Sequence, residues 1–448
     1  MTGDLEKKSL EELLTPEGFP CSCGRRHSCG VRQVTVERGA VSRVAETVRR
    51  FGGKRPFLIE DGNTHEAAGE LVESLLEREG MPFTRFLFGN ERIEPDEKAL
   101  GQVMTGFDPA CDFVVGIGTG TINDIGKMTA RVSRLPYMIV ATAPSMDGFA
   151  SATSSMASRG VKVSLPSACA TAILADLDIL CGAPDRLLRA GLGDMLAKYV
   201  SICEWRISHL INGEYYCEHV ASLIRGSRER CVASAEGILR RDPEAMRELV
   251  EGLILTGMAM AFAGVSRPAS GMEHYFSHLW DMRGLEFHTD CDLHGIQVGV
   301  GTLLSLRVYD GIRALTPDRG KALAYAEAFR FEDWALTLRS FLGSGAEELI
   351  RQEAGEGKYD RGKHRARLEV ILGHWGEIRE IIGQELPASS GIRDFMAALG
   401  LPVDPEEIGI SRETARLSFL ATKDIRDKYI ASRLLWDLGV LEEFAERI

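Results

Sequence analysis

The sequence lacks an apolar run long enough to cross a membrane as a helix. Its most apolar long window, 253–265, is interrupted by glycine. It also falls short of the roughly 20 residues that a membrane-spanning helix needs. The beginning of the chain is charged and amphipathic and has no apolar core of the kind found in a secretory signal peptide. We therefore expect a cytoplasmic protein without a membrane span.

Basic residues are in short supply as well. The 448 residues include 53 lysines and arginines against 65 aspartates and glutamates, which gives a formal net charge of −12. A nucleic-acid-binding surface needs a basic excess, so we expect no nucleic-acid partner. Because the whole chain repels anions, an anionic ligand must be held locally by N–H groups, lysines or a metal ion.

The cysteines do not form the pattern of a disulfide framework. Ten of them are scattered along the chain, and several, such as Cys111 and Cys203, lie in apolar segments. This distribution indicates reduced thiols. Apolar residues make up 44% of the chain and charged residues 26%, which is ordinary for a globular protein with a large core.

An extension rich in proline, glycine and cysteine occupies residues 1–32. It carries Cys21, Cys23, His27 and Cys29, four potential soft ligands within nine positions, which suits a small metal site. A thiol-bearing loop without metal is favoured over such a site, because structural zinc sites usually space their paired ligands further apart. The role of this cluster stays open.

From residue 33 onward, short apolar runs alternate with amphipathic stretches. We expect strands at 34–36, 56–59, 83–88, 113–115 and 137–141. We expect helices at 41–51, 65–78, 95–106 and from 121 onward. This alternation is the signature of a largely parallel sheet that is covered on both faces.

The second half of the chain has a different character. Residues 146–182 begin as a loop rich in serine, threonine and methionine and continue with apolar runs at 161–165 and 172–179. From residue 184 onward the periodicity is almost wholly helical. We therefore expect three parts, namely the extension at 1–32, an α/β domain at 33–183 and a helical domain at 184–448.

A glycine-rich stretch, 112–127, follows one of the expected strands. It reads DFVVGIGTGTINDIGK, and its turn consists of Gly118, Thr119, Gly120 and Thr121. Such a turn lets backbone N–H groups and a helix dipole face an anion, which predicts a phosphate-binding loop. Thr121 stands where the common dinucleotide fingerprint has its third glycine, and no P-loop lysine follows. The alternative is an ordinary tight turn from strand to helix.

Two further strand ends carry polar residues. Asp61 follows one strand, and Thr142 and Ser145 follow another. Ligands gather at the carboxyl ends of parallel strands, so we expect these residues to line one site together with the glycine turn. A carboxylate at a strand end suits the hydroxyls of an adenosine ribose, although a helix N-cap explains Asp61 equally well.

Three polar features interrupt the apolar faces of the helical half. Asp194 and Lys198 lie four residues apart on one expected helix, and His274 and His278 do so on another. His294 opens a third helix. An aspartate with two or three histidines can form an open metal site. Each feature alone has an ordinary structural explanation, but their presence in one helical domain favours a site.

Five ordered motifs carry a resemblance to a known family: GIGTGTINDIGK, ATAPSMDGFAS, GLGDMLAK, SGMEHYFSH and HGIQVGVGT. Together they resemble the glycerol-1-phosphate dehydrogenase family. The Cys-rich extension and the long helical tail resemble its bacterial AraM-like branch. This family belongs to a group of metal-dependent (iron-containing) alcohol dehydrogenases that includes glycerol dehydrogenase and 3-dehydroquinate synthase.

The resemblance implies a dehydroquinate synthase-like fold, with an α/β NAD(P)-binding domain on a mainly parallel sheet and an all-α metal-binding domain after it. It implies NAD(H) or NADP(H) as cofactor, and a homo-oligomer, either a dimer or larger. It implies one divalent metal ion per chain, Zn²⁺ or Ni²⁺, bound by Asp194, His274 and His294. The nicotinamide and diphosphate would lie against 118–121 and 142–145.

The implied reaction is the reversible reduction of dihydroxyacetone phosphate to sn-glycerol 1-phosphate, in which the metal polarises the carbonyl or alcohol oxygen. The resemblance places Asp124 and Lys127 near the reacting end of the cofactor and His278 beside the substrate. The substrate phosphate needs cationic or N–H partners, for which Lys198, Arg267 and His278 are candidates.

Other activities remain open at this point. In dehydroquinate synthase-like lyases the first metal ligand is typically glutamate, so Asp194 favours a dehydrogenase. A glycerol dehydrogenase would differ in not requiring a phosphate. A non-catalytic nucleotide-binding protein is disfavoured because Asp194, His274 and His294 are intact. Asp61 favours NAD over NADP because a carboxylate repels a 2′-phosphate.

Overall fold

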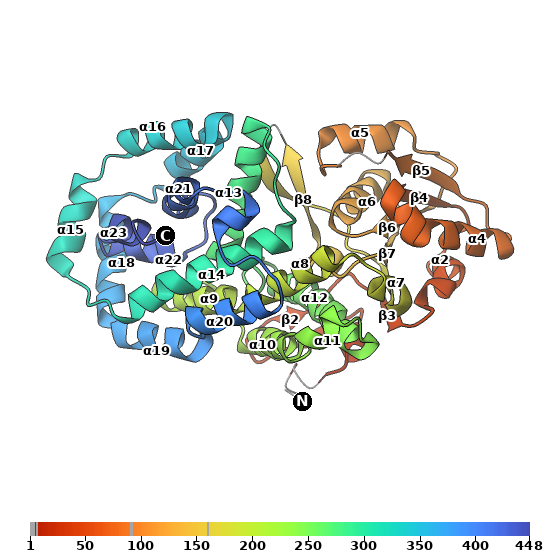
Figure 1. Cartoon of the computed structure of the whole chain (residues 1–448), viewed down its shortest axis with the longest axis horizontal. Coiled ribbons are helices and arrows are strands. Elements are labelled where there is room, and N and C mark those ends of the chain that lie inside the picture. The colour runs from red at the N-terminus through yellow and green to blue at the C-terminus, as the bar shows by residue number, and fades with distance from the viewer. Residues whose placement is uncertain (1–4, 6–7, 90–92, 159–160) are drawn as a thin grey trace. The chain divides into compact units, whose positions relative to one another are not determined.

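The structure is a computed structural model that describes residues 5, 8–89, 93–158 and 161–448 (Figure 1). Residues 1–4 and 6–7 of the expected extension therefore lie outside the described residues. Within the described ranges, none of the helices is both long and apolar enough to span a membrane.

Two compact units make up the chain. Unit 1 comprises Met1–Met195 and Cys217–Ser266, and unit 2 comprises Leu196–Tyr216 and Arg267–Ile448.

Unit 1 is built on the parallel sheet that the sequence predicts. In the described part of the chain, six strands pair in the order β3-β10-β7-β6-β4-β5, and all neighbours are parallel. The strands are β3 (Gln33–Glu37), β4 (Pro56–Asp61), β5 (Thr84–Phe88), β6 (Phe113–Gly118), β7 (Tyr137–Ala141) and β10 (Ala172–Asp176). Every residue of β6, β7 and β10 is buried, as expected for a sheet covered on both faces.

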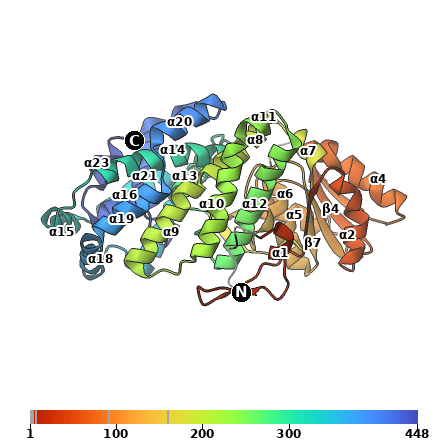
Figure 2. The ribbon, with the colours of Figure 1, turned by 90° about the horizontal axis from the view of Figure 1, so that it is seen from below.

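Helices cover both faces of this sheet. On one side lie α2 (Val44–Arg50) and α4 (Glu70–Arg78), and on the other α5 (Glu97–Thr105) and α6 (Gly120–Ser133) (Figure 2). The first pair buries Val48 and Leu76 in one apolar core with sheet residues such as Val115. The helices expected at 41–51, 65–78 and 95–106 are thus confirmed, with ends that differ by a few residues.

A hairpin of β8 (Thr153–Ser158) and β9 (Val161–Pro166) stands apart from the main sheet. The expectation of a loop was wrong for β8, because its small polar residues gave no apolar signal. The strand nevertheless pairs along its whole length with β9 and buries Ser154 and Met156 on one side. Pairing with an apolar partner, rather than its own composition, specifies this strand.

The remaining elements of unit 1 are a short hairpin near the N-terminus and a group of helices. The hairpin consists of β1 (Phe19–Pro20) and β2 (Arg26–His27). The helices are α1 (Leu10–Leu13), α7 (Leu177–Cys181), most of α8 (Asp185–Leu196), α10 (Glu218–Ala233), α11 (Ala235–Leu239) and α12 (Pro243–Ala263). Helices α10 and α12 lie side by side in Figure 2.

Unit 2 is wholly helical in its described residues. Its main helices are α9 (Lys198–Asn212), α13 (Met272–Phe287), α14 (His294–Arg313), α17 (Ala346–Glu356) and α21 (Arg412–Thr422). Helices α13 and α14 pack closely, because a Cβ on Gly301 would lie 2.5 Å from the carbonyl oxygen of Glu273. A glycine is therefore needed where α14 crosses the start of α13.

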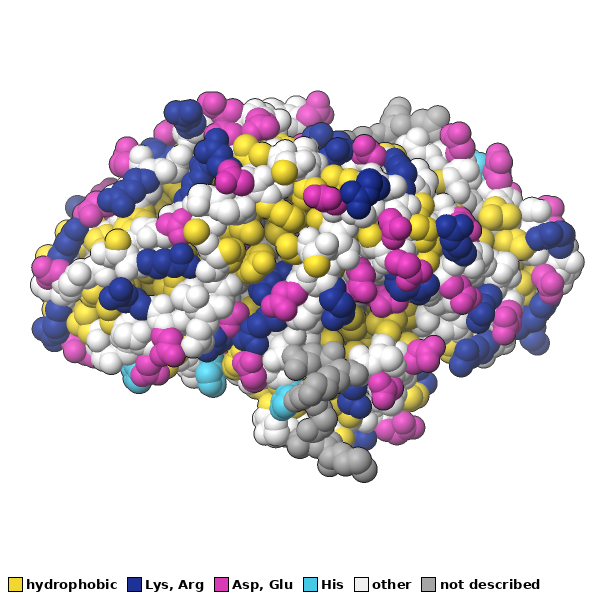
Figure 3. Space-filling view, turned by 60° about the horizontal axis from the view of Figure 1, so that its bottom comes forward, with side chains coloured by type: hydrophobic (Ala, Val, Ile, Leu, Met, Phe, Trp, Pro, Cys, Tyr) yellow, Lys and Arg dark blue, Asp and Glu magenta, His cyan; other side chains and the backbone are white. Residues whose placement is uncertain are grey.

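Charged side chains of both signs are interspersed on the face shown in Figure 3. Basic residues do not gather into a stripe on this face, which agrees with the acidic net charge. This face therefore offers no continuous cationic track for a nucleic-acid backbone.

Candidate functional site

The glycine turn joins β6 to α6, as the sequence predicts. A Cβ on Gly118 would lie 2.6 Å from Cβ of Ile122, so this position requires glycine. Helix α6 begins at Gly120, and Thr119 at its N-cap makes no side-chain hydrogen bond to the first turn. The N–H groups of that turn are thus not capped by Thr119 and face the end of the strand, which suits an anion.

The ends of β6 and β7 come together, as expected. The hydroxyls of Thr119 and Ser145 lie 2.6 Å apart. The N–H of Thr142 donates to the carbonyl oxygen of Gly118 at 3.0 Å. Thr142 and Ser145 are both buried. These residues form one connected surface at the carboxyl edge of the sheet, and their binding of a cofactor stays a prediction.

Asp61 ends β4, the strand next to β6. One of its carboxylate oxygens accepts the N–H of Thr64 at 2.9 Å, and the Thr64 hydroxyl is 2.9 Å from the N–H of Asp61. This is a capping box, so the N-cap interpretation is confirmed for the side chain. The other carboxylate oxygen is not part of the cap, and contact with a ribose stays a prediction.

Lys127 has a role that the sequence did not suggest. Its side chain is fully buried, and its ammonium donates to the carbonyls of Gly148 and Thr153 and to the Ser151 hydroxyl. It also pairs with Asp124 at 3.2 Å. Because Gly148 and Ser151 follow β7 and Thr153 starts β8, Lys127 fixes the segment that leads into the hairpin.

Asp194 lies on α8 and is completely buried. Its carboxylate accepts the N–H of Asp147 at 2.9 Å. Helix α8 approaches the same segment closely, because a Cβ on Gly191 would lie 2.0 Å from the carbonyl oxygen of Pro144. The end of β7, which carries Ser145, and the carboxylate of Asp194 are thus held together within unit 1.

The two histidines predicted to bind metal meet in unit 2. The ring centroids of His274 and His294 are 5.2 Å apart. Nδ1 of His274 donates to the Glu273 carboxylate at 2.9 Å, and Nδ1 of His294 lies 3.1 Å from the Ser277 hydroxyl. With both Nδ1 atoms engaged, each ring offers its Nε2 atom for a cation, as metal-binding histidines usually do.

His278 lies one helical turn after His274 on α13. Its ring centroid is 6.4 Å from that of His274 and 6.1 Å from that of His294. His278 is nearly buried. The three imidazoles therefore form one cluster, and the position of His278 beside the substrate, which the resemblance implies, stays a prediction.

Two buried carboxylates that sequence analysis missed position this cluster. Glu204 accepts the N–H of Met272 at 2.9 Å and the Tyr309 hydroxyl proton at 3.2 Å, and Glu273 accepts the N–H of Gly271 at 2.6 Å. Burial raises the pKa of Glu204 to about 8 and that of Glu273 to about 7. The position of Glu204 within an apolar stretch of α9 was the sequence feature that could have indicated a buried carboxylate.

The two cations proposed for the substrate phosphate are buried in unit 2 with protein partners. The Lys198 ammonium donates to the carbonyl of Ala269 at 3.1 Å. The Arg267 guanidinium donates to Glu214 at 2.8 Å, to the Tyr429 carbonyl and to the Ser208 hydroxyl. Every nitrogen of Arg267 thus has a structural partner, and phosphate binding by either cation stays a prediction.

Comparison with known proteins places this geometry in context. The family model described as iron-containing alcohol dehydrogenase matches residues 35–184. A glycerol dehydrogenase structure from Schizosaccharomyces pombe covers 94% of this chain and 91% of that chain at 18% identity, with a TM-score of 0.61. At that identity the likeness shows a shared fold.

Named relatives carry the comparison further. A glycerol-1-phosphate dehydrogenase (NAD(P)+) of Geobacillus stearothermophilus is 29% identical over 94% of this chain and 95% of the relative. One of Bacillus subtilis is 32% identical over 69% of this chain and 82% of the relative. With this identity and coverage, and with the fold described above, the chain belongs to the glycerol-1-phosphate dehydrogenase family.

Proposed function

We propose that this chain catalyses the reversible, NAD(P)H-linked reduction of dihydroxyacetone phosphate to sn-glycerol 1-phosphate. Relatives named glycerol-1-phosphate dehydrogenase (NAD(P)+) support the substrate and the cofactor class. The observation that carries the proposal is the pair His274 and His294, each held at Nδ1 by a neighbouring side chain.

The donor set suits a divalent metal ion. In our proposal Asp194, His274 and His294 hold it, and it is Zn²⁺ or Ni²⁺. Neutral imidazoles and a carboxylate are good ligands for both ions, so metal availability decides between them. The hydrogen bond from His274 to Glu273 supports this assignment, because it keeps Nδ1 protonated and leaves the lone pair on Nε2.

The nucleotide belongs at the carboxyl edge of the sheet. We assign its diphosphate to Gly118–Ile122 N–H groups and to the hydroxyls of Thr119, Thr142 and Ser145. Their connection across β6 and β7 supports this assignment. Asp61 is assigned to the adenosine ribose, with a preference for NAD(H) over NADP(H).

When bound, the metal supplies Lewis-acid polarisation of the carbonyl or alcohol oxygen and the nicotinamide supplies the hydride. The residues of the chain bind and orient the substrate. His278 is assigned to hold the proton that the product hydroxyl gains. Asp124 is assigned to the substrate, and Lys127 acts as a positioning residue because its ammonium holds the segment at 148–153.

The phosphate of the substrate needs cations in an acidic protein. We keep Lys198 and Arg267 as candidate partners of this phosphate. The Arg267→Lys variant would separate the role of Arg267 from that of Lys198. We also propose that the chain acts in the cytoplasm as a homo-oligomer. Light scattering after size-exclusion chromatography tests the oligomer.

A side-by-side assay tests the activity. The metal-loaded chain is incubated with NADH and either dihydroxyacetone phosphate or dihydroxyacetone, and with NAD and either sn-glycerol 1-phosphate, sn-glycerol 3-phosphate or glycerol. We expect turnover of dihydroxyacetone phosphate and sn-glycerol 1-phosphate, and loss of turnover after chelation. Equal rates with dihydroxyacetone and its phosphate would contradict the proposal and favour a glycerol dehydrogenase.

A further inference from the structure

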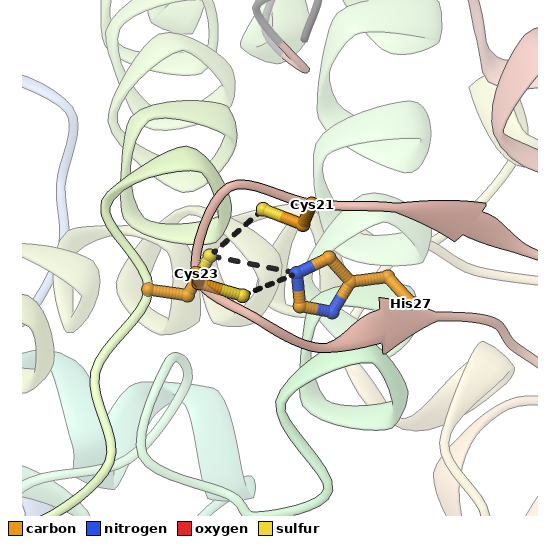
Figure 4. Close-up of side chains that lie close together, drawn as sticks. Cys21, Cys23 and His27 are labelled. Atoms are coloured by element: carbon orange, nitrogen blue, oxygen red, sulfur yellow. Dashed lines mark hydrogen bonds between the residues drawn. The ribbon is translucent and has the colours of Figure 1, made fainter.

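A second group of side chains that could hold a metal ion lies wholly within unit 1. It consists of Cys21, Cys23, His27 and Cys217, whose candidate ligand atoms all lie within 4.8 Å of one another. Figure 4 shows Cys21, Cys23 and His27 pointing toward one another from the β1–β2 hairpin, the two cysteines from its loop and His27 from β2. None of the cysteines of this group forms a disulfide in the structure.

The distances within this group match those of ligands around one zinc ion. Tetrahedral geometry with Zn–S near 2.3 Å and Zn–N near 2.0–2.1 Å separates two sulfurs by about 3.8 Å, and a sulfur from a nitrogen by about 3.5 Å. The Sγ atoms of Cys21 and Cys217 are 3.7 Å apart. Nε2 of His27 is 3.4 Å from Sγ of Cys23 and 3.5 Å from Sγ of Cys217.

The tautomer of His27 is fixed by a contact outside the group. Nδ1 of His27 lies 2.8 Å from the carbonyl oxygen of Phe262, near the end of α12. A carbonyl can only accept, so Nδ1 carries the proton and Nε2 presents its lone pair to the three sulfurs. Metal-binding histidines usually donate the N–H of their other ring nitrogen to such an acceptor, which fixes the orientation of the ring.

The surroundings hold the ligands in place. His27 and Cys217 are completely or almost completely buried, and the ring of His27 packs against those of Phe19 and Phe262. The loop closes through a hydrogen bond from the N–H of Cys21 to the carbonyl of Arg25 at 2.9 Å. Gly24 permits this loop with a φ of +84°, a conformation that favours glycine.

The hairpin itself needs such a support. Strands β1 and β2 have two residues each, and a hairpin of that size is not stable alone in water. Cys217 is the residue that precedes α10, about 190 residues away in sequence. A shared metal ion would therefore join the N-terminal hairpin to the α10–α12 helix pair.

We propose that Cys21, Cys23, His27 and Cys217 bind one structural Zn²⁺ ion. Three thiolates and an imidazole form a closed set of four ligands, which leaves no open position for a substrate and is typical of structural zinc. Soft sulfur ligands also distinguish this site from the Asp and His ligands proposed for the catalytic metal. The inference does not depend on the proposed activity.

A metal measurement in the full-length chain tests the site. The His294→Ala variant is used, since it lacks a ligand of the proposed catalytic site. We expect about one equivalent of tightly bound zinc per chain, measured by inductively coupled plasma mass spectrometry. Titrating the thiols with an organomercurial should release that zinc to a chromophoric chelator. A chain without zinc, or with zinc that thiol modification leaves bound, would overturn the proposal.

Cobalt substitution gives a second test, whose first measurement uses the wild-type protein. Wild-type protein produced with Co²⁺ should show intense near-ultraviolet charge-transfer bands from thiolate to cobalt. Cys217→Ser should weaken these bands, whereas the matched Cys29→Ser should not, because the Cys29 thiol faces the Val31 carbonyl instead. Absence of the bands in the wild-type protein, or a Cys21–Cys217 disulfide found by mass spectrometry, contradicts the zinc site.

Discussion

His274 and His294 depend on different neighbours for their orientation. His274 is held by a buried carboxylate, and His294 by the hydroxyl of Ser277 at 3.1 Å. The weaker of these supports is the simpler one to remove, since Ser277 is buried on α13 and a change to alanine leaves little empty space. A substitution of Ser277 can therefore remove the support that orients the His294 ring while leaving His294 itself available to bind the metal.

We expect Ser277→Ala to weaken binding of the catalytic metal by about 10–100-fold, because loss of such a support typically has this effect. Metal competition titrations measure the affinity. Ser305→Ala is the matched control, because the Ser305 hydroxyl donates to the carbonyl of Gly301 on its own helix. Unchanged affinity in Ser277→Ala would show that this hydroxyl does not support a metal ligand.

Asp61 combines an observed structural role with a predicted functional one, and two substitutions distinguish them. Serine is also a good N-cap, so Asp61→Ser should keep the stability within about 0.5 kcal/mol, whereas Asp61→Ala should lose about 1 kcal/mol. Both remove the charge and should lower the KM for NADPH relative to NADH. Steady-state kinetics and urea unfolding measure these effects. An unchanged cofactor preference in both variants would leave Asp61 as a cap only.

Residues that act together were predictable where they are near in sequence. The His274–His278 spacing was readable because residues four apart share a helical face. The group of Cys21, Cys23, His27 and Cys217 could be predicted only in part. The sequence offered Cys29 as a fourth potential ligand with Cys21, Cys23 and His27 and left the role of the cluster open, whereas the structure places Cys217 beside the other three. No local pattern can indicate a ligand so distant in sequence, because its position depends on how α10 packs.

At the scale of elements, the strands and helices of the α/β part were predictable because its apolar runs are long, buried and separated by turn residues. Strand β8 was not, since its stability comes from pairing with β9. The buried contacts of Lys127 on α6 were also hidden, because a lysine has the same helical propensity whether it faces solvent or the segment at 148–153.

Lys127 provides a test of that segment. We expect Lys127→Met to cost about 1–3 kcal/mol of stability, because the carbonyl of Thr153 and the carboxylate of Asp124 lose a buried partner. Urea unfolding measures the loss, and limited proteolysis should show faster cleavage near the β8–β9 hairpin. The exposed Lys54 provides the control substitution to methionine. Equal proteolysis rates in the two variants would contradict this role.

A buried glutamate on α17 makes the stability of unit 2 depend on pH. Burial raises the pKa of Glu353 to about 7, and only one of its oxygens has a partner, the N–H of Tyr359 at 3.2 Å. As pH rises, the unfolded chain ionises at this residue first, near the ordinary value of 4.5. The stability from neutral Glu353 is therefore full below that value and is lost as pH rises through about 7.

Glu353→Gln should remove this dependence while keeping an acceptor for Tyr359. We expect the wild-type melting temperature to fall more than that of the variant, by about 2–4 °C, between about pH 5 and about pH 8. Differential scanning calorimetry measures both. Glu356→Gln, an exposed carboxylate on the same helix, should behave as the wild type. A wild-type pH profile in Glu353→Gln would refute the linkage.

At the scale of the whole molecule, the compact units of the structure differ from the domains that the sequence predicts. Residues 217–266 belong to compact unit 1, although their composition is helical like the rest of the second half. These residues belong to unit 1 because α12 packs next to β3. Helical periodicity predicts that a segment is a helix, but it does not predict which element that helix packs against. The domain bounds 33–183 and 184–448 stay a prediction, since a domain in the evolutionary or folding sense is not the same as a compact unit.

Nucleotide binding and metal binding can nevertheless be measured separately in variants of the two units. The residues assigned to the nucleotide, such as Gly118 and Ser145, all belong to unit 1, whereas His294 belongs to unit 2. We expect His294→Ala to lose the catalytic metal and turnover while keeping NADH affinity within about threefold, since no assigned nucleotide contact changes. Fluorescence titration with NADH and metal analysis provide the two measurements.

Gly118→Ala is the reciprocal variant, because it changes the nucleotide loop and leaves the histidines unchanged. In Gly118→Ala the added Cβ would lie 2.6 Å from Cβ of Ile122, so the start of α6 must shift and NADH binding should fall. The histidine pair is untouched, and metal binding should persist. If His294→Ala abolished NADH binding as well, independent binding of nucleotide and metal would be excluded. If a chelated sample of His294→Ala retained full activity, the proposal of a catalytic metal would be wrong. The NADH and metal affinities of the two variants therefore decide whether the nucleotide and the metal ion bind independently.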